Sequence, residues 1–129
     1  CVLGAEKKLP KDKNSKFEVK IDYLHGSVAI GVATNDVLRN QNGFGANGSY
    51  CLYSPNHIYE NGTQKSFMNY SNLATESIVG VLYIPKKGEI LFDLNGTHIY
   101  TVKVDPSHQN VDLYPFVNLS HNGSKLSFL

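Results

Sequence analysis

Residues 78–104 read IVGVLYIPKKGEILFDLNGTHIYTVKV and carry the strongest fold signal of the chain. The first seven residues are apolar, as in a buried strand, and residues 85–88 (PKKG) have the composition of a turn. In residues 89–94 (EILFDL) every second side chain is apolar, which is the period of a strand. Asn95-Gly96 is the strongest short hairpin signal, because both residues tolerate the positive φ of a type I′ turn. We therefore predict three consecutive antiparallel strands, over residues 78–84, 89–94 and 97–104.

The rest of the chain continues this pattern. Residues 17–23 (FEVKIDY) alternate, with the apolar residues predicted on one face, and residues 27–34 (SVAIGVAT) are apolar on both faces. The second stretch is typical of a central strand that is covered on both sides. Residues 35–48 are polar and rich in Gly and Asn, which predicts a long loop. Shorter strands are predicted over residues 49–53, 57–59, 65–68, 113–119 and 125–129, the last two as a hairpin around residues 121–123.

No window of ten residues shows the 3.6-residue period of a helix. Short strands with turns at this spacing predict an all-β fold, a sandwich or jelly roll of two antiparallel sheets with almost no helix. We expect a basic lead-in segment over residues 1–15 and one β-sandwich domain over residues 16–129. The predicted core consists of Phe17, Val19, Ile21, Val28, Ile30, Val32, Val79, Val81, Ile90, Phe92, Tyr100, Leu113 and Val117.

Composition excludes several classes of protein. The chain has 129 residues, of which 41% are hydrophobic and 18% charged, and its net charge is +1. This is enough apolar material for one core and too much for a disordered chain. Nucleic acid is not an expected partner, because a basic field is missing, and the apolar runs are too short to span a membrane. We expect a monomeric domain.

The two cysteines, Cys1 and Cys51, are predicted to be free thiols in a reducing compartment, with a disulfide as the alternative. A cytoplasmic or nuclear location is expected, and secretion is less favoured. Asparagine is abundant and forms six Asn-X-Ser/Thr sequons, which we weigh weakly as evidence of secretion. They begin at Asn47, Asn61, Asn69, Asn95, Asn118 and Asn122.

The residues that could form catalytic or cofactor motifs lack the neighbouring elements or the spacing that such sites need. We therefore predict no enzyme, no cofactor and no metal site. Residues 43–48 (GFGANG) fit G-x-G-x-x-G, but a strand follows them, whereas a dinucleotide site needs a helix there. The five histidines lack the spacing of metal ligands. Cys51 has no local nucleophile motif and is expected to be a small buried hydrophobe.

An ordered series of short motifs resembles the SPRY domain family. The series comprises residues 17–21 (FEVKI), 29–34 (AIGVAT), 49–50 (SY), 78–81 (IVGV), 88–92 (GEILF), 95–96 (NG) and 113–117 (LYPFV). The resemblance covers about residues 16–129. It implies a bent sandwich of two antiparallel sheets, as in concanavalin-like jelly rolls. It also implies a non-catalytic module that binds a peptide or loop of a protein partner, as one domain of a larger adaptor or ubiquitin-ligase-type protein.

The resemblance extends to a peptide pocket known from SPRY domains of the SOCS-box type. The matching positions are Thr34, Tyr59 and His121, of which His121 replaces a tryptophan of the family. We expect three segments, residues 34–42, 55–61 and 120–122, to converge at one end of the sandwich, with Tyr59 as the aromatic anchor. The predicted partner-binding residues are Thr34, Asn35, Asp36, Asn56, His57, Tyr59, His121 and Asn122. The alternative function is that of a carbohydrate-binding, lectin-like β-sandwich.

Overall fold

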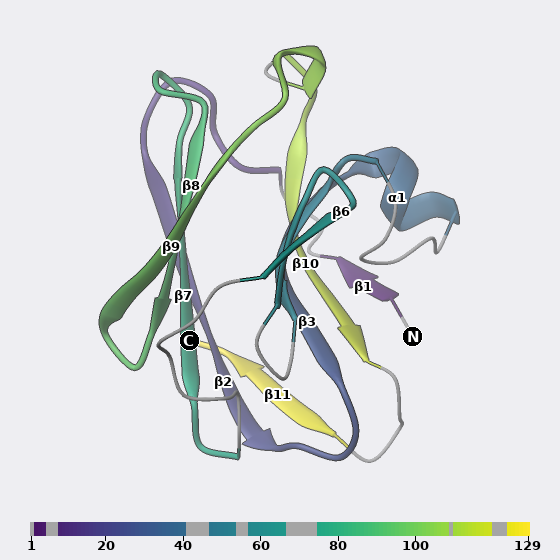
Figure 1. The fold of residues 1–129 in the computed structure, drawn as a ribbon, viewed down its shortest axis with the longest axis vertical. Helices are drawn as coiled ribbons and strands as arrows, with labels where there is room; N and C mark the ends of the chain where they lie inside the picture. Colours follow the sequence, from purple (N-terminus) through teal and green to yellow (C-terminus); the bar gives the residue numbers. More distant parts are fainter. Residues whose placement is uncertain are drawn as a thin grey trace.

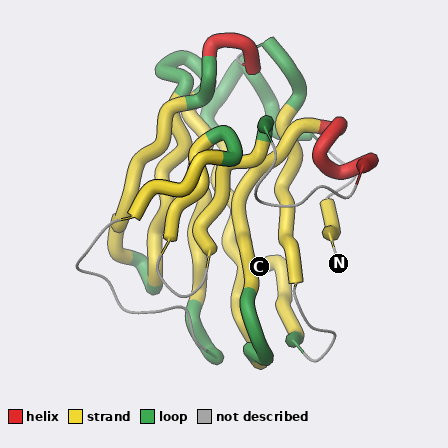
Figure 2. The backbone as a smooth tube through the Cα atoms, turned by 45° about the vertical axis from the view of Figure 1, so that its right-hand side comes forward, coloured by secondary structure: helices red, strands yellow, loops and turns green. Residues whose placement is uncertain are grey.

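The computed structural model describes residues 2–4, 8–40, 47–53, 57–66, 75–108, 110–119 and 124–129. These residues form a sandwich of two antiparallel sheets (Figure 1, Figure 2), which confirms the predicted all-β class. The six-stranded sheet has the order β1 (Val2–Gly4), β10 (Leu113–Leu119), β3 (Val28–Thr34), β4 (Ser49–Tyr53), β5 (His57–Glu60) and β6 (Thr63–Ser66). The five-stranded sheet has the order β11 (Lys125–Phe128), β2 (Ser15–Tyr23), β7 (Ile78–Ile84), β8 (Glu89–Leu94) and β9 (Thr97–Lys103).

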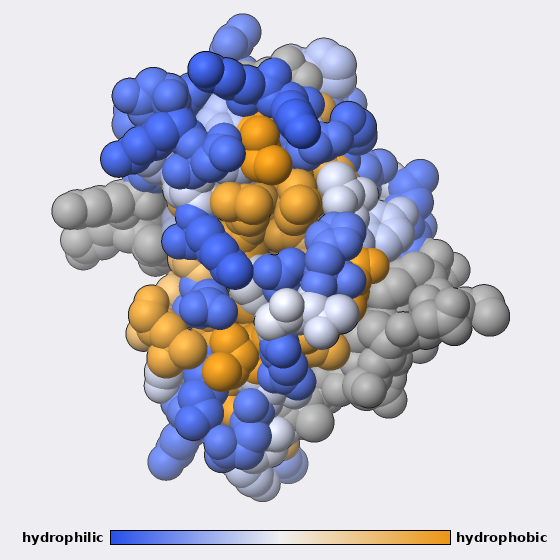
Figure 3. Space-filling view, turned by 90° about the vertical axis from the view of Figure 1, so that its left-hand side faces the viewer, coloured by the Kyte–Doolittle hydropathy of each residue, from blue (hydrophilic) through white to orange (hydrophobic). Residues whose placement is uncertain are grey.

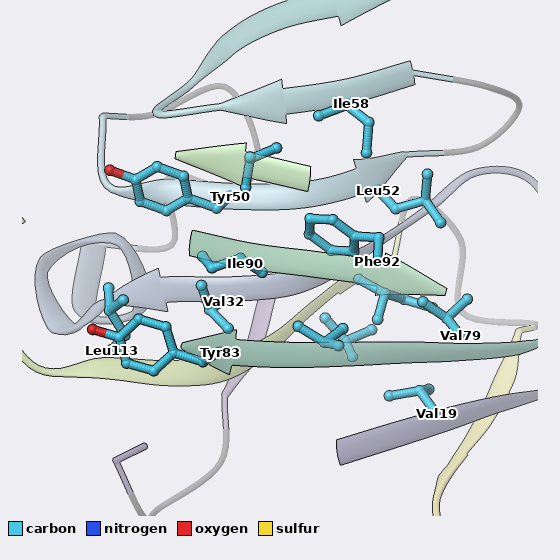
Figure 4. Packing of buried hydrophobic residues seen from close by; sticks show 14 of the residues in the cluster. Val19, Val32, Tyr50, Leu52, Ile58, Val79, Tyr83, Ile90, Phe92 and Leu113 are labelled. Atoms are coloured by element: carbon cyan, nitrogen blue, oxygen red, sulfur yellow. The ribbon is translucent and has the colours of Figure 1, made fainter. Parts of the chain in front are cut away.

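The main core lies between the two sheets and is built by strand alternation. On β4 and β5, Tyr50, Leu52 and Ile58 point inward and are fully buried, opposite residues such as Phe92 of the other sheet (Figure 4). The predicted core is confirmed in the main, since all of its members are buried except Phe17 and Tyr100, which pack against it partly buried. Tyr23 ends β2 and is 51% exposed, so the buried face of that strand stops before it.

The two hairpins that join β7, β8 and β9 form as predicted. Strands β7, β8 and β9 pair in sequence, and Asn95 and Gly96 have φ angles of 52° and 87°, as a type I′ turn requires. The side-chain oxygen Oδ1 of Asn95 also accepts a hydrogen bond of 2.8 Å from the backbone N–H of Ile78. The turn is therefore held by side-chain chemistry as well as by backbone preference.

Helix α1 (Asn35–Asn40) replaces the first part of the predicted loop over residues 35–48. It has six residues, fewer than two turns, so it leaves no periodic signal that a sequence window could detect. Val37 is 1% exposed and anchors the helix on the outer face of the six-stranded sheet. Within the described ranges, no helix has the length and apolar character needed to cross a membrane.

The predicted hairpin between the last two strands is wrong. Strand β11 does not pair with β10 but with β2 of the other sheet, where Leu126 lies opposite Ile21. The chain thus crosses between the sheets after Leu119. At the other terminus, β1 pairs with β10, and Leu9, 7% exposed, belongs to the core, so part of the lead-in segment contributes to the sandwich.

Candidate functional site

Four side chains gather on the outer face of the six-stranded sheet, over strands β4, β5 and β6. Side chains alternate along strands, and the register places Tyr53 opposite His57 and Tyr59 opposite Gln64. Because Tyr50 and Leu52 point into the core, Tyr53 and its cross-strand neighbours point outward. We call Tyr53, His57, Tyr59 and Gln64 the aromatic face.

The members of the aromatic face contact one another directly. The rings of Tyr53 and His57 stack with centroids 6.4 Å apart, and the rings of Tyr53 and Tyr59 meet edge to face at 5.8 Å. The hydroxyl of Tyr59 donates a 3.2 Å hydrogen bond to Oε1 of Gln64, whose Nε2 lies 3.2 Å from Nδ1 of His57. These contacts restrict the side-chain rotamers, so the face offers aromatic surface that is already ordered before a partner binds.

A small second core lies beneath the aromatic face. It consists of Ala29, Ala33, Val37, Cys51 and Phe116, all buried, and Leu38, Tyr53 and Tyr59 pack against it partly buried. The aromatic face and helix α1 therefore pack against the same hydrophobic cluster. This packing fixes the positions of Tyr53, Tyr59 and the helix.

The strands come very close together at Gly31 of β3, between the two cores. A Cβ atom built there would lie 2.0 Å from the carbonyl oxygen of Tyr50 and 2.6 Å from Cα of Cys51. Only glycine fits such an approach of backbone to backbone. Gly31 therefore allows the close packing of β3 against β4, the strand that carries Tyr53 of the aromatic face.

The Cys51 thiol and the Tyr59 phenol are neutral near pH 7. Burial raises the pKa of the Cys51 thiol and, with the nearby Tyr53 and Cys51 groups, also raises the pKa of Tyr59. The uncharged ring of Tyr59 favours contact with apolar side chains of a partner, because neither group has a charge that must be desolvated on binding.

The predicted residues Thr34, Asn35 and Asp36 lie elsewhere, at the end of β3 and the start of α1. The backbone N–H of Thr34 donates to the carbonyl of Gly48 at 3.0 Å, and the N–H of Gly48 donates to Oδ1 of Asn61 at 2.7 Å. Thr34 is 6% exposed, whereas Asn35 and Asp36 are exposed. The side chain of Thr34 is therefore nearly buried, whereas its two neighbours present side chains to solvent.

The predicted convergence of three segments at one end is wrong. Thr34 pairs with Leu113, whereas Leu119, which precedes residues 120–122, pairs with Val28 at the opposite end of β3. The two ends are about 20 Å apart, since a strand rises about 3.3 Å per residue. Segment 55–61 contains the whole of β5, so His57 lies at the Val28 end and Asn61 at the Thr34 end. The sequence predicted most strands, but β6 begins at Thr63 rather than at residue 65, and β1 was not predicted. The motifs also do not show at which end of the sheet each strand stops.

Three predicted contacts, Asn56, His121 and Asn122, lie outside the described residues. Two members of the aromatic face, Tyr53 and Gln64, were not predicted. The missing signal was available in the sequence: an Asn61-Gly62 turn of two residues sets a register in which Tyr59 faces Gln64, and alternation then adds Tyr53. Among the residues with described side chains, no three of the His, Cys, Asp or Glu side chains come together as a metal site needs.

The side of the molecule formed by β7, β8 and β9 is a mixed surface. Figure 3 shows apolar areas on it that are divided by hydrophilic side chains. An ion pair of 3.3 Å between Lys16 and Asp93 lies on this outer face, beside Gly80. Unlike the aromatic face, this surface therefore has apolar areas that are separated by charged side chains.

Comparisons with known proteins agree on one family. The family model described as "SPRY domain" matches residues 14–129. A search of curated protein sequences finds no match.

Solved structures agree with the family match at the level of the fold. Three of them are a human SPRY domain (TM-score 0.77, 21% identity), the SPRY domain of human HERC1 (0.75, 14%) and the TRIM65 PSpry domain (0.74, 18%). The alignments cover 98%, 98% and 99% of this chain and 82%, 80% and 70% of those chains, respectively. At these identities the likeness shows the fold alone. Because the family model itself spans almost the whole chain, the resemblance found in the motifs is confirmed, and the chain belongs to the SPRY domain family.

Proposed function

We propose that this domain binds an extended peptide or loop of a protein partner and has no catalytic activity of its own. Its membership of the SPRY family, whose domains are protein-interaction modules, is the observation that carries the proposal. The aromatic face supports it, because ordered aromatic side chains are the usual anchors of protein interfaces.

Tyr59 is the central anchor in this proposal. It contacts Tyr53 on one side and Gln64 on the other, and it packs on the second core. A partner residue placed on its ring would be surrounded by further contacts that exclude water, as energetic centres of interfaces require. His57 extends the surface towards the end of the sheet where Leu119 lies. Asn56, His121 and Asn122, which lie outside the described residues, are proposed as additional contacts, and Asn35 and Asp36 as contacts of a separate region at the start of α1.

The test is a comparison of two tyrosine variants in affinity enrichment. The bait is the domain, and the partner is identified by mass spectrometry from cells that express the parent protein. Tyr59→Ala should weaken binding about thirtyfold, equivalent to about 2 kcal/mol. Tyr23→Ala is the matched control, because Tyr23 is 51% exposed and lies on the other sheet. Equal binding by wild type and both variants, with both variants folded, would contradict the proposed site.

A glycan array with the same variants separates this function from carbohydrate binding. The peptide-binding proposal expects no specific glycan signal, whereas a signal that Tyr59→Ala removes would support a lectin-like domain instead. Aromatic rings also stack on sugars, so the array addresses the same surface.

We further propose that the domain works within a larger adaptor or ubiquitin-ligase-type protein in an intracellular, reducing compartment. The free, buried Cys51 thiol supports a reducing environment. Co-purification of the partner with the intact parent protein, and its loss when this domain is deleted, would test the adaptor role.

A further inference from the structure

Strand β6 forms one edge of the six-stranded sheet, and no described strand lies beyond it (Figure 2). The Asn61-Gly62 turn before it has φ angles of 53° and 79°, so it is a two-residue type I′ turn. In such a hairpin the flanking residues, Glu60 and Thr63, exchange hydrogen bonds, and the next pair does not. The backbone N–H and C=O of Gln64 therefore point away from β5, and so do those of Ser66 two residues later.

Strand β9, at the edge of the five-stranded sheet, has a backbone group that a side chain covers. On β9, the backbone N–H of Lys103 donates a 2.8 Å hydrogen bond to Oε1 of Glu60, so a side chain from the other sheet covers that position. Native proteins usually protect exposed edges in this way, because uncovered backbone groups pair with other chains. In the described residues, the outward backbone groups of Gln64 have no such cover.

A polar cavity of about 340 Å³ opens on the inner side of the same edge. Its lining comes from both sheets and consists of Glu60, Asn61, Thr63, Lys65, Lys103, Val104, Asp105 and Pro106. Its carboxylates already have partners: Glu60 accepts from Lys103, and Oδ1 of Asp105 accepts from the N–H and the hydroxyl of Ser107 at 2.9 and 2.7 Å. With two lysines and two carboxylates in the lining, the cavity suits a polar side chain rather than a strongly charged one.

We propose that the partner segment binds by adding a strand to β6, an inference that rests on the proposed peptide-binding function. Successive side chains of an added strand point to opposite sides of the sheet. One set would lie beside Gln64 and reach Tyr59 on the aromatic face, and the other set would enter the polar cavity. The partner is therefore an extended segment in which apolar and polar residues alternate, held at the backbone by Gln64 and Ser66.

The experiment uses a peptide selected from a display library of random twelve-residue peptides on the wild-type domain. The peptide is synthesised with a single N-methyl group at each backbone position in turn, and its affinity is measured by calorimetry. Strand addition predicts a loss of about tenfold at alternate positions only, where the N–H faces β6. Equal losses along the peptide, or none, would overturn it.

Two variants of Gln64 test whether its backbone N–H donates a hydrogen bond to the peptide. Gln64→Pro removes an N–H that points away from β5, so it should leave the hairpin paired, which circular dichroism can check. Gln64→Ala keeps the N–H and removes the same side chain. We expect Gln64→Pro to bind at least about tenfold more weakly than Gln64→Ala. Equal affinities in two folded variants would contradict the inference.

The outcomes separate this inference from the function on which it rests. If Tyr59→Ala abolishes peptide binding but methylation shows no alternation, the proposed function stands and strand addition fails. If the library yields no binding peptide, or if Tyr59→Ala leaves binding unchanged, the proposed function fails, and the inference fails with it.

Discussion

The hydroxyl oxygen of Tyr50 lies 2.8 Å from Nδ1 of His108, and this contact joins the core of the six-stranded sheet to the segment leaving the five-stranded sheet. The same oxygen accepts a 3.0 Å hydrogen bond from the backbone N–H of Asp105. Since that N–H uses a lone pair, the phenol proton is available for the imidazole nitrogen. His108 belongs to the 3-10 helix η2 (Pro106–His108), so Tyr50 fixes the connection between β9 and β10.

Replacement of Tyr50 by phenylalanine should therefore destabilise the domain. Tyr50→Phe leaves the N–H of Asp105 without its acceptor, and a cost of about 1–2 kcal/mol is expected. The measurement is urea unfolding followed by circular dichroism. Tyr83→Phe is the control, because Tyr83 is also buried in the core, at 2% exposure, and no hydrogen bond of its hydroxyl to described residues is found. A smaller effect for Tyr50→Phe than for Tyr83→Phe would contradict this role.

Stability should fall in alkaline solution. Burial raises the pKa of Tyr50 from 10.0 to about 12; the Asp105 hydrogen bond lowers it in part, and the charge of Asp105 raises it further. The unfolded chain thus releases this proton near pH 10, while the folded chain keeps it to about pH 12. The free energy of unfolding should decrease across that interval by up to ~2 kcal/mol.

Tyr59 and Tyr83 also have raised pKa values, so the wild-type curve contains several contributions. The difference between wild type and Tyr50→Phe isolates that of Tyr50. Parallel curves for the two proteins from pH 9 to pH 12 would show that Tyr50 titrates normally.

Gly31 should not tolerate alanine. The added Cβ would overlap the backbone of Tyr50 and Cys51, which cannot rotate away as a side chain could. We expect a loss of roughly 3 kcal/mol or more in the free energy of unfolding. Gly96→Ala is the control, because a Cβ at that position would meet nothing within 4 Å. Only the φ of +87° disfavours alanine there, and we expect it to lower the free energy of unfolding by about 1 kcal/mol. Equal unfolding midpoints for the two variants would contradict the close approach.

Cys51 should be unreactive in the folded domain. It is buried, and burial also raises the pKa of its thiol, which leaves little thiolate for reaction. In a Cys1→Ser background, a thiol reagent such as Ellman's reagent should label the chain only after denaturation, and reductant should leave the melting temperature unchanged. Rapid labelling of the native Cys1→Ser protein, or a shift of several degrees in wild type with reductant, would contradict a buried, free thiol.

Local turn chemistry explains why much of this fold could be predicted from sequence. Strands β7 and β8 have the predicted bounds because the PKKG and Asn95-Gly96 turns define them on each side. The β11 pairing could not be predicted, because an Asn-Gly signal indicates a turn but not the sheet in which the next strand pairs. Helix α1 was missed because its stability comes from Val37 on the second core, a tertiary contact.

The candidate site was harder to predict because it depends on register. Tyr59 and His57 were predicted correctly as members of one strand, β5. Through the strand register, Tyr59 lies level with Gly31 in the middle of β3 and His57 lies level with Ala29 near its start, whereas Thr34 ends the strand. Motifs do not record the position along the sheet that each side chain occupies. The partners that the structure does give them, Tyr53 and Gln64, lie on neighbouring strands and follow from alternation and pairing.

Asn61 should contribute more than Asn95 to the free energy of unfolding, although both begin Asn-Gly turns with nearly equal φ angles of 53° and 52°. Each accepts a hydrogen bond from a distant N–H, Asn61 from Gly48 at 2.7 Å and Asn95 from Ile78 at 2.8 Å. Asn61 is partly buried, whereas Asn95 is exposed, so water replaces the lost acceptor more readily at Asn95. We expect Asn61→Gly, which keeps the positive φ, to cost about 1 kcal/mol, and Asn61→Ala about 2 kcal/mol.

Hydrogen exchange of single amides can verify this difference. In Asn61→Gly the amide of Gly48 should lose protection while that of Ile78 is unchanged, and in Asn95→Gly the reverse should hold, with a smaller loss of global stability. Because the N–H of Thr34 donates to the carbonyl of Gly48, its protection should also fall in Asn61→Gly. An unchanged Gly48 amide in that variant would mean that the side chain of Asn61 does not tie the β5–β6 hairpin to the start of β4.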